Sequence, residues 1–186
     1  MKAVETELSG VFVIEFDIQN DSRGYFFEIY RKNRFEELGL AMPFVQDNIS
    51  YSQGNVLRGL HFQEPFAQGK LVSVIQGTIY DVAVDIRPAS PTFKKWIGIN
   101  LSPELGKMLW IPPGFAHGFA TLTKTVGILY KVTEYWHPEA EQILNCKDPE
   151  LAIKWPITNP IMSERDFKAP NLADVVALPN YYSEVN

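Results

Sequence analysis

The segment 58–70, RGLHFQEPFAQGK, contains the side chains best suited to chemistry in this sequence. A histidine transfers protons near neutral pH, and a nearby lysine stabilises developing negative charge, so His61 and Lys70 suit proton abstraction beside a carbonyl group. Strand alternation places His61 on one face and Arg58 on the other, unless a bulge near Gly59 turns Arg58 inward. A histidine on a strand is more often structural than basic, so both interpretations stay open at this point.

Lys70 directly precedes a second apolar run, and the pairing of that run decides what surrounds the lysine. A two-residue turn at 76–77 would pair Lys70 with Ala83 and make Asp81 and Asp85 its diagonal neighbours on one face. A lysine beside carboxylates stays protonated, which is the state that stabilises an oxyanion. The alternative is an exposed salt bridge on an edge strand.

Short apolar runs separated by turn residues fill most of the chain. Such a series predicts a mainly β protein that forms a sandwich or barrel, because no helices intervene to build a parallel sheet. Residues 11–30 are expected to form a hairpin, residues 31–40 a helix that ends near Gly39, and the proline-rich chain after Tyr135 an irregular tail around the barrel. No repeat or linker divides the chain, so residues 1–186 are expected to form a single domain. The expected strands cover residues 11–17, 25–30, 44–52, 56–62, 71–75, 78–86, 96–101, 107–111, 118–122 and 126–133.

The composition excludes several classes of function. The formal net charge of -5 argues against a general nucleic-acid surface or an anionic-membrane surface, although a local basic pocket can still bind a small anion. The single cysteine, Cys146, excludes an internal disulfide and fits a reducing compartment. Residues 1–17 contain no apolar stretch of signal or transmembrane length, so we expect a cytoplasmic protein.

A second histidine lies in a segment with recognisable spacing. The sequence GKMLWIPPGFAHGF contains Gly106, Pro112, Gly114 and His117, and this arrangement resembles the second signature of the cupin superfamily, a β-barrel of jelly-roll type. The first cupin signature requires two histidines and a glutamate, but Lys70 occupies the glutamate position here. A lysine cation repels a divalent metal, so the sequence resembles a cupin barrel without a metal site.

A longer series of motifs resembles one family over nearly the whole chain. In order, these motifs are DSRGYFFEIY, QDNIS, RGLHFQ followed by Lys70, DVAVDIRPASPTFKKW, PPGFAHGF, YKVTEYWHPEAEQ and SERDFKAP. Together they resemble the dTDP-4-dehydrorhamnose 3,5-epimerases, cupin-like enzymes of dTDP-L-rhamnose synthesis. The resemblance implies conversion of dTDP-4-dehydro-6-deoxy-D-glucose into dTDP-4-dehydro-L-rhamnose. Enolisation next to the C4 ketone would invert C3 and C5, and no cofactor is expected.

The resemblance also implies a catalytic set of four residues. His61 is the base, Asp166 supports its imidazole, Lys70 stabilises the C4 oxyanion, and Tyr130 returns a proton from the opposite face. From the residues alone, the expected role of Asp166 is that of a helix N-terminal or surface carboxylate, and the expected role of Tyr130 is core packing.

The implied substrate-binding residues are spread along the chain. The cationic members are expected to pair with the diphosphate, the other polar members to bind the sugar hydroxyls and the pyrimidine edge, and Phe26, Tyr135 or Trp136 to stack on the thymine. A homodimer is also implied, in which N-terminal strands complete the neighbour's sheet and Arg23 and Glu28 act across the interface. The implied set is Arg23, Glu28, Gln46, Asn48, Arg58, His117, Glu141 and Lys168.

Three other interpretations stay open. An epimerase of a related dTDP-4-keto-6-deoxy sugar that inverts only C3 or only C5 shares the histidine, the lysine and the barrel, although Tyr130 favours double inversion. A metal-dependent cupin enzyme would need a ligand where Lys70 stands. A non-catalytic sugar-binding cupin would bind the nucleotide sugar without using His61 as a base. Neither nucleic acid nor a membrane is expected as a partner.

Overall fold

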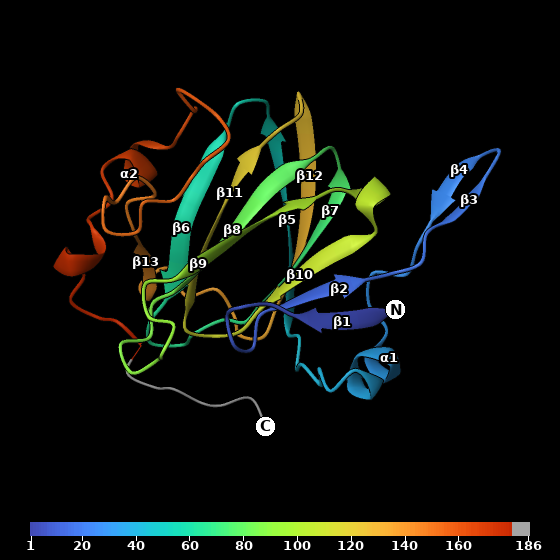
Figure 1. Ribbon diagram of the computed structural model, residues 1–186, viewed down its shortest axis with the longest axis horizontal. Helices are drawn as coiled ribbons and strands as arrows, with labels where there is room; N and C mark the ends of the chain where they lie inside the picture. Colours follow the sequence, from blue (N-terminus) through green and yellow to red (C-terminus); the bar gives the residue numbers. More distant parts are fainter. Residues whose placement is uncertain (180–186) are drawn as a thin grey trace.

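Two antiparallel sheets, packed face to face, form the body of the computed structural model, which describes residues 1–179 (Figure 1). The six-stranded sheet has the order β1-β2-β10-β7-β12-β5, and the five-stranded sheet has the order β13-β6-β11-β8-β9. The expected mainly β fold of jelly-roll type is therefore confirmed. The strands are β1 (Lys2–Glu5), β2 (Phe12–Glu15), β3 (Gln19–Asp21), β4 (Gly24–Phe26), β5 (Gln46–Gln53), β6 (Leu57–Gln63), β7 (Lys70–Gln76), β8 (Ile79–Asp85), β9 (Trp96–Leu101), β10 (Lys107–Ile111), β11 (Phe115–Thr121), β12 (Thr125–Val132) and β13 (Glu141–Ile143).

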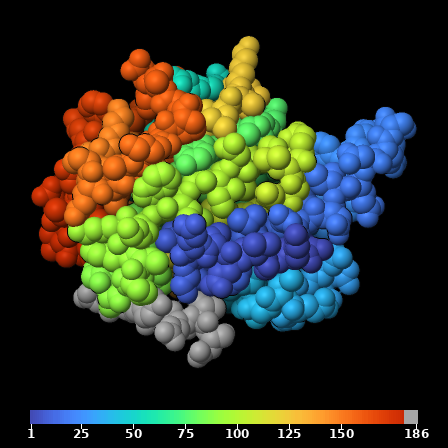
Figure 2. All heavy atoms as spheres, viewed as in Figure 1, coloured from blue at the N-terminus to red at the C-terminus, as the bar shows by residue number. Residues whose placement is uncertain are grey.

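The N-terminal region differs from the expected hairpin over residues 11–30. β2 pairs with β1 and β10, whereas β3 and β4 pair only with each other and form a small hairpin that projects from the body (Figures 1 and 2). The sequence does not predict β1 or β13. Both are short edge strands without an apolar run, so pairing with a neighbouring strand, and not local propensity, makes them extended.

The expected hairpin between β7 and β8 is wrong. β7 pairs with β10 and β12 in one sheet, and β8 pairs with β11 and β9 in the other. Gly77 has a φ of 76°, which glycine adopts at little cost, and it turns the chain from one sheet to the other. A Cβ at this position would lie 2.2 Å from the carbonyl oxygen of Thr125. β7 and β8 therefore face each other across the core instead of lying side by side.

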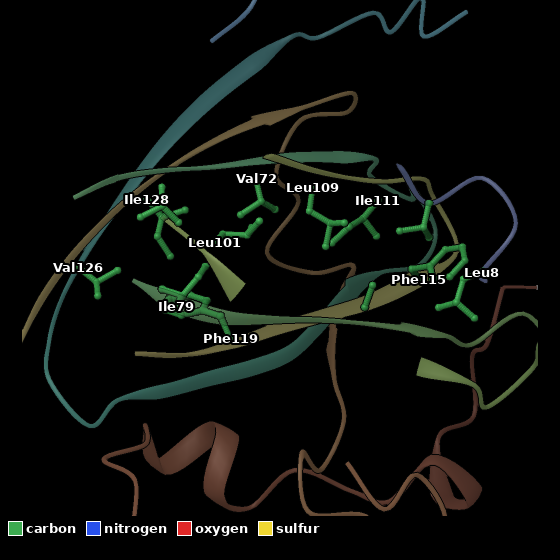
Figure 3. Packing of buried hydrophobic residues seen from close by; sticks show 13 residues of the cluster. Leu8, Val72, Ile79, Leu101, Leu109, Ile111, Phe115, Phe119, Val126 and Ile128 are labelled. Atoms are coloured by element: carbon green, nitrogen blue, oxygen red, sulfur yellow. The ribbon is translucent and has the colours of Figure 1, made fainter. Parts of the chain in front are cut away.

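The main core fills the space between the sheets. Side chains from β7, β10 and β12 meet side chains from β8 and β11, as Figure 3 shows for Val72 and Ile128 on one side and Ile79 and Phe119 on the other. These residues alternate along their strands, so each strand presents one apolar face inward. Apolar contact across this layer holds the two sheets together.

Each sheet is covered differently on its outer face. Residues after β13, including Leu151 and Leu172, pack on the five-stranded sheet. This segment contains the short helix α2 (Glu164–Phe167) and the 3₁₀ turn η2 (Leu172–Asp174), whereas the 3₁₀ turn η1 (Pro103–Leu105) lies between β9 and β10. The helix α1 (Lys32–Glu37), which was expected within residues 31–40, buries Phe35 against the six-stranded sheet. No helix in residues 1–179 is both long and apolar enough to cross a membrane.

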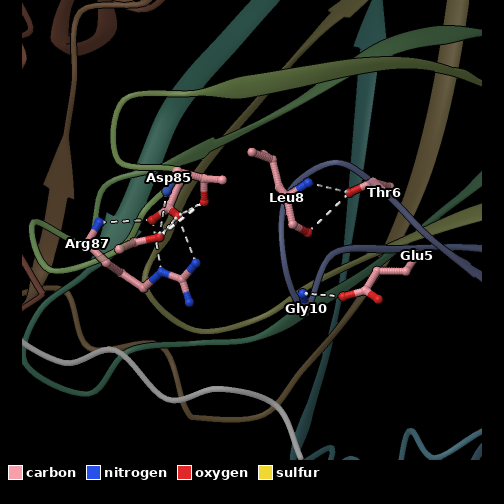
Figure 4. A network of polar contacts seen from close by, with 8 residues as sticks. Glu5, Thr6, Leu8, Gly10, Asp85 and Arg87 are labelled. Carbon is pink, nitrogen blue, oxygen red and sulfur yellow. Dashed lines mark hydrogen bonds and ion pairs between the residues drawn. The ribbon is translucent and has the colours of Figure 1, made fainter.

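A buried polar network closes the end of β8. The Asp85 carboxylate accepts hydrogen bonds from the backbone amide and guanidinium of Arg87 and from the hydroxyls of Ser90 and Thr92 (Figure 4). Burial raises the pKa of Asp85, but these hydrogen bonds outweigh it and hold the pKa below its ordinary value. Asp85 is thus a structural carboxylate committed to this network, which corrects its expected place beside Lys70.

Candidate active site

His61 on β6 and Asp166 on α2 form a hydrogen-bonded pair, although 105 positions separate them in the chain. Nε2 of His61 lies 2.7 Å from Oδ1 of Asp166. Ser163 caps α2 by accepting a hydrogen bond from the backbone amide of Asp166 at 3.0 Å, which fixes the carboxylate in the first helical turn. Asp166 is therefore a helix N-terminal carboxylate and the partner of His61 at once.

The charge state of Asp166 decides which ring nitrogen of His61 is basic. Burial raises the pKa of Asp166, but hydrogen bonds from His61 and Ser163 outweigh that effect and leave the pKa below its ordinary value. The side chain is an ionised acceptor, so Nε2 carries the hydrogen that it donates to Asp166. Nδ1 then holds the free lone pair and can accept a proton.

A bulge in β6 brings Arg58 onto the same face as His61. His61 is opposite His117, but Arg58 is opposite Phe119, so two residues of β6, Gly59 and Leu60, lie opposite one residue of β11, Gly118. Gly59 has a φ of 111°, and a Cβ there would lie 2.6 Å from the Cα of Gly118. The structure therefore confirms the bulge near Gly59 that was predicted to be necessary for Arg58 to turn inward.

Lys70 lies at the start of β7, opposite Val132 on β12. Burial lowers the pKa of Lys70 to about 8, while the carboxylates of Glu141 and Asp81 act in the opposite direction. At neutral pH the ammonium form dominates by roughly ten to one. Asp81, an expected neighbour, acts on Lys70 from β8 in the facing sheet and not across a β7–β8 hairpin. The second carboxylate is Glu141 on β13, and not the expected Asp85.

Tyr130 projects from β12, on the wall that faces His61. Its hydroxyl lies 3.1 Å from Oγ of Ser50 on the neighbouring strand β5. Burial raises the pKa of Tyr130 far above its ordinary value, and the charge of Asp81 adds to this increase. The hydrogen bond to Ser50 and the charge of Arg58 act in the opposite direction but do not offset it. Tyr130 is therefore a neutral phenol that can donate a proton.

His117 and Asp81 form a second, fully buried pair. Nε2 of His117 lies 3.0 and 2.9 Å from the two carboxylate oxygens of Asp81. The exposed fractions of these residues are 5% for His117 and 0% for Asp81. The His117 ring also packs edge-on against Tyr130, with ring centroids 6.1 Å apart. Both residues belong to the five-stranded sheet, so this pair fixes His117 in the wall that also carries His61.

Most of these groups line one cleft of about 240 Å³ between the sheets. Asp81 lies behind His117, and Asp166 lines a neighbouring pocket on the other side of His61. The cleft includes four of the expected binding residues, and Trp136, one of the three expected aromatic platforms, lies at its rim. Gln46 does not line the cleft; it donates to Asn48 Oδ1 at 2.8 Å and accepts from the amide of Trp136 at 3.1 Å. The lining residues are Asn48, Ser50, Arg58, His61, Gln68, Lys70, His117, Gly118, Phe119, Tyr130, Val132, Trp136 and Glu141.

Besides Gln46, three expected binding residues do not line this cleft. Arg23 forms an ion pair with Asp21 on the projecting β3–β4 hairpin. Glu28 pairs with Arg34, and Lys168 pairs with Glu164 on the surface. Phe26 and Tyr135 also lie outside the cleft lining.

Sequence reasoning does not single out Ser50, Gln68 or Arg165. Arg165 forms an ion pair with Glu141 and so ties α2 to the rim of the cleft. Ser50 lies in the motif QDNIS, two residues after Asn48, and strand alternation could have placed both side chains on one face. Within residues 1–179, no group of three or more histidine, cysteine or acidic side chains is arranged to hold a metal ion.

The fold and the cleft together define a cupin-like protein, a jelly-roll sandwich with a histidine, a lysine and a tyrosine in a cleft between its sheets. A family model described as dTDP-4-dehydrorhamnose 3,5-epimerase matches residues 5–174. The chain belongs to this family.

Individual relatives and solved structures resemble this chain over most of their length. The dTDP-4-dehydrorhamnose 3,5-epimerase of Salmonella typhimurium strain LT2 is 49% identical over 92% of this chain and 96% of its own. The crystal structure of dTDP-6-deoxy-D-glucose-3,5-epimerase from Legionella pneumophila Philadelphia 1, in complex with dTDP-4-keto-L-rhamnose, has a TM-score of 0.93 and 46% identity, and covers 98% of this chain and 99% of its own. The crystal structure of ChmJ, a 3'-monoepimerase from Streptomyces bikiniensis, in complex with dTDP-quinovose, has a TM-score of 0.85 and 32% identity, and covers 93% of this chain and 88% of its own. The shared fold therefore accommodates both double and single epimerases.

Proposed function

We propose that this protein is an isomerase that converts dTDP-4-dehydro-6-deoxy-D-glucose into dTDP-4-dehydro-L-rhamnose by inverting C3 and C5. One observation carries the proposal: a base and an acid lie on opposite walls of one cleft. His61 comes from the five-stranded sheet, and Tyr130 comes from the six-stranded sheet. Inversion at carbon requires removal of a proton from one face and delivery to the other, and this arrangement supplies both.

The C4 ketone of the substrate makes the hydrogens at C3 and C5 acidic. Nδ1 of His61 removes the proton, and the electron pair moves through the new carbon–carbon double bond onto the C4 oxygen. The ammonium group of Lys70, protonated below about pH 8, stabilises this oxyanion. Tyr130 then protonates the same carbon from the opposite face, and the carbonyl re-forms with the configuration inverted.

The remaining cleft residues suit a nucleotide sugar. Arg58 presents a cation for the diphosphate, and its guanidinium is held by Ser52 Oγ at 3.1 Å and by the carbonyl of Tyr51 at 3.3 Å. Asn48 and His117 offer hydrogen bonds to the sugar. The half-exposed ring of Trp136, at the rim, offers a stacking surface for thymine.

We also propose a homodimer in which the β3–β4 hairpin of one protomer reaches the cleft of the other. This arrangement gives Arg23 and Glu28 a route to the substrate that they lack within one chain. It also covers part of the apolar outer face of β5, where Ile49 and Tyr51 are 70% and 55% exposed. Light scattering of the purified protein tests the dimer, and a monomer that retains full activity would contradict it.

The cytoplasm is the proposed site of action. The one cysteine, Cys146, is a buried free thiol, which fits a reducing compartment.

Incubation with dTDP-4-dehydro-6-deoxy-D-glucose in D₂O tests the reaction. We expect deuterium at both C3 and C5 and an L-rhamno product, as measured by NMR. Label at one carbon only would replace the proposal with a single epimerase, and the absence of label would remove the enzymatic assignment. The His61→Ala variant should lose both labels while it still binds dTDP.

A further inference from the structure

The hydroxyl of Tyr130 contacts the hydroxyl of Ser50 on the edge strand β5. Within residues 1–179, Tyr130 Oη forms a hydrogen bond with Ser50 Oγ, and the two oxygens are 3.1 Å apart. Ser50 is opposite Ile128 and Tyr130 is opposite Asn48, so Ser50 and Tyr130 are diagonal neighbours on one face of the sheet. Both side chains line the cleft.

A partly buried phenol needs such a partner if it is to act as an acid. When Tyr130 gives up its proton, it becomes a phenolate in a site that is shielded from much of the solvent, and this burial opposes the charged state. A serine hydroxyl that donates to the phenolate oxygen replaces part of the lost hydration. Donation by Ser50 also leaves the phenolic hydrogen free to point at the substrate.

The same strand also positions the positive charge that favours the phenolate. Ser52 follows Ser50 by two residues, so both hydroxyls lie on the inner face of β5. Ser52 accepts a hydrogen bond from Nε of Arg58, which keeps the guanidinium on the Tyr130 side of the cleft. β5 therefore supports Tyr130 directly through Ser50 and indirectly through Arg58.

We infer that Ser50 is a positioning residue for Tyr130, which orients the phenol for proton delivery and stabilises the phenolate that remains. The inference rests on the proposed epimerisation. In the step concerned, the O–H bond of Tyr130 breaks and a C–H bond forms at the enolate carbon. The enolate electron pair enters the new bond, the negative charge passes from the enolate to Tyr130, and a proton from water later restores the phenol.

Four variants test the inference: Ser50→Ala, Ser50→Thr, Tyr130→Phe and the double variant Ser50→Ala/Tyr130→Phe. Deuterium incorporation from D₂O at C3 and C5 is measured by NMR at saturating substrate. Ser50→Ala should lower kcat for inversion by about 10- to 100-fold, the range for a hydrogen bond to a charged group, and change KM by less than about threefold. Ser50→Thr keeps the hydroxyl and should restore most of the rate.

The double variant separates a positioning role from a structural one. If Ser50 acts through Tyr130, Ser50→Ala should have no further effect in the Tyr130→Phe background. Equal losses in both backgrounds, or a Ser50→Ala enzyme with the wild-type rate, would overturn the inference. Gln53→Ala, an exposed change on the same strand, is the matched control and should leave the rate unchanged. A wild-type enzyme that incorporates no deuterium would instead defeat the proposed function.

Discussion

Replacing Lys70 with methionine should abolish turnover and make the protein more stable. Burial lowers the pKa of Lys70 from 10.5 to about 8, so the folded protein holds the ammonium group at a cost. A shift of roughly 2.5 units corresponds to about 3–4 kcal/mol, at about 1.4 kcal/mol per unit, and it already includes the attraction of Asp81 and Glu141 for the ammonium group. Methionine has no charge to desolvate, but imperfect packing of its side chain in the place of lysine offsets part of the gain. The expected net gain in the free energy of unfolding at pH 7 is therefore about 1–3 kcal/mol.

The pH dependence of this gain gives the prediction its test. Between pH 8 and pH 10.5 the unfolded chain binds more protons at Lys70 than the folded chain does, so the stability of the wild type rises across this window. The advantage of Lys70→Met should be complete below about pH 8 and shrink towards zero near pH 10.5. Urea unfolding at pH 7 and pH 10.5, monitored by circular dichroism, measures the difference in unfolding free energy between Lys70→Met and the wild type.

A matched surface change controls for the substitution itself. Lys107→Met, on β10, removes a partly exposed lysine that pairs with Glu15 and should give no comparable gain at either pH. A Lys70→Met protein no more stable than the wild type at pH 7, or a gain of the same size at both pH values, would refute the account of a desolvated ammonium.

The rate of the wild-type enzyme should respond to the same titration. Because the oxyanion requires protonated Lys70, kcat should fall above pH 8 and reach about one tenth of its plateau near pH 9. The carboxylate of Glu141 raises this pKa, so Glu141→Gln should move the basic limb to lower pH. Glu139→Gln, on the exposed surface, should leave the limb in place. Superimposable limbs for wild type and Glu141→Gln would show that Glu141 does not influence Lys70.

Three further changes address the base, the bulge and the core. Asp166→Asn should lower kcat by about 10²-fold, because His61 loses the carboxylate that supports its ring. Steady-state kinetics at saturating substrate measures kcat, and an unchanged kcat would contradict this role. Gly59→Ala should cost at least about 2 kcal/mol of stability, because its φ of 111° and the 2.6 Å approach to Gly118 exclude a side chain; unchanged urea unfolding would contradict this. Phe35→Ala should cost about 3–5 kcal/mol, since the ring is 1% exposed, and a Tm within a degree of the wild type would be the opposite outcome.

The sequence predicted strands well where local signals agreed. β10 has the predicted bounds because apolar residues lie between Gly106 and Pro112, which both stop a strand. The pairing of β7 was not predictable in the same way. A Gln76–Gly77 turn suits a two-residue hairpin and a crossing between sheets equally well, and only the packing of the whole core selects the crossing.

The candidate site was predictable only in part for a related reason. Alternation alone placed Arg58 on the outer face, and the structure required a bulge at Gly59 to bring it beside His61. No local pattern connects His61 with Asp166, because contact between them depends on the docking of the whole C-terminal segment. Arg23 and Glu28 lie outside the cleft of one chain, so their proposed role depends on a second copy.

The hydrophobic layer between the sheets also sets the distance across which the reaction operates. His61 is attached to one sheet and Tyr130 to the other, and side chains such as Phe119 and Ile128 hold those sheets apart. The gap that the sugar ring must fit is therefore a property of core volume as well as of the cleft lining. Adaptation to a warmer or colder habitat would change the same side chains, so thermal tolerance and stereochemical fidelity should evolve together in this protein.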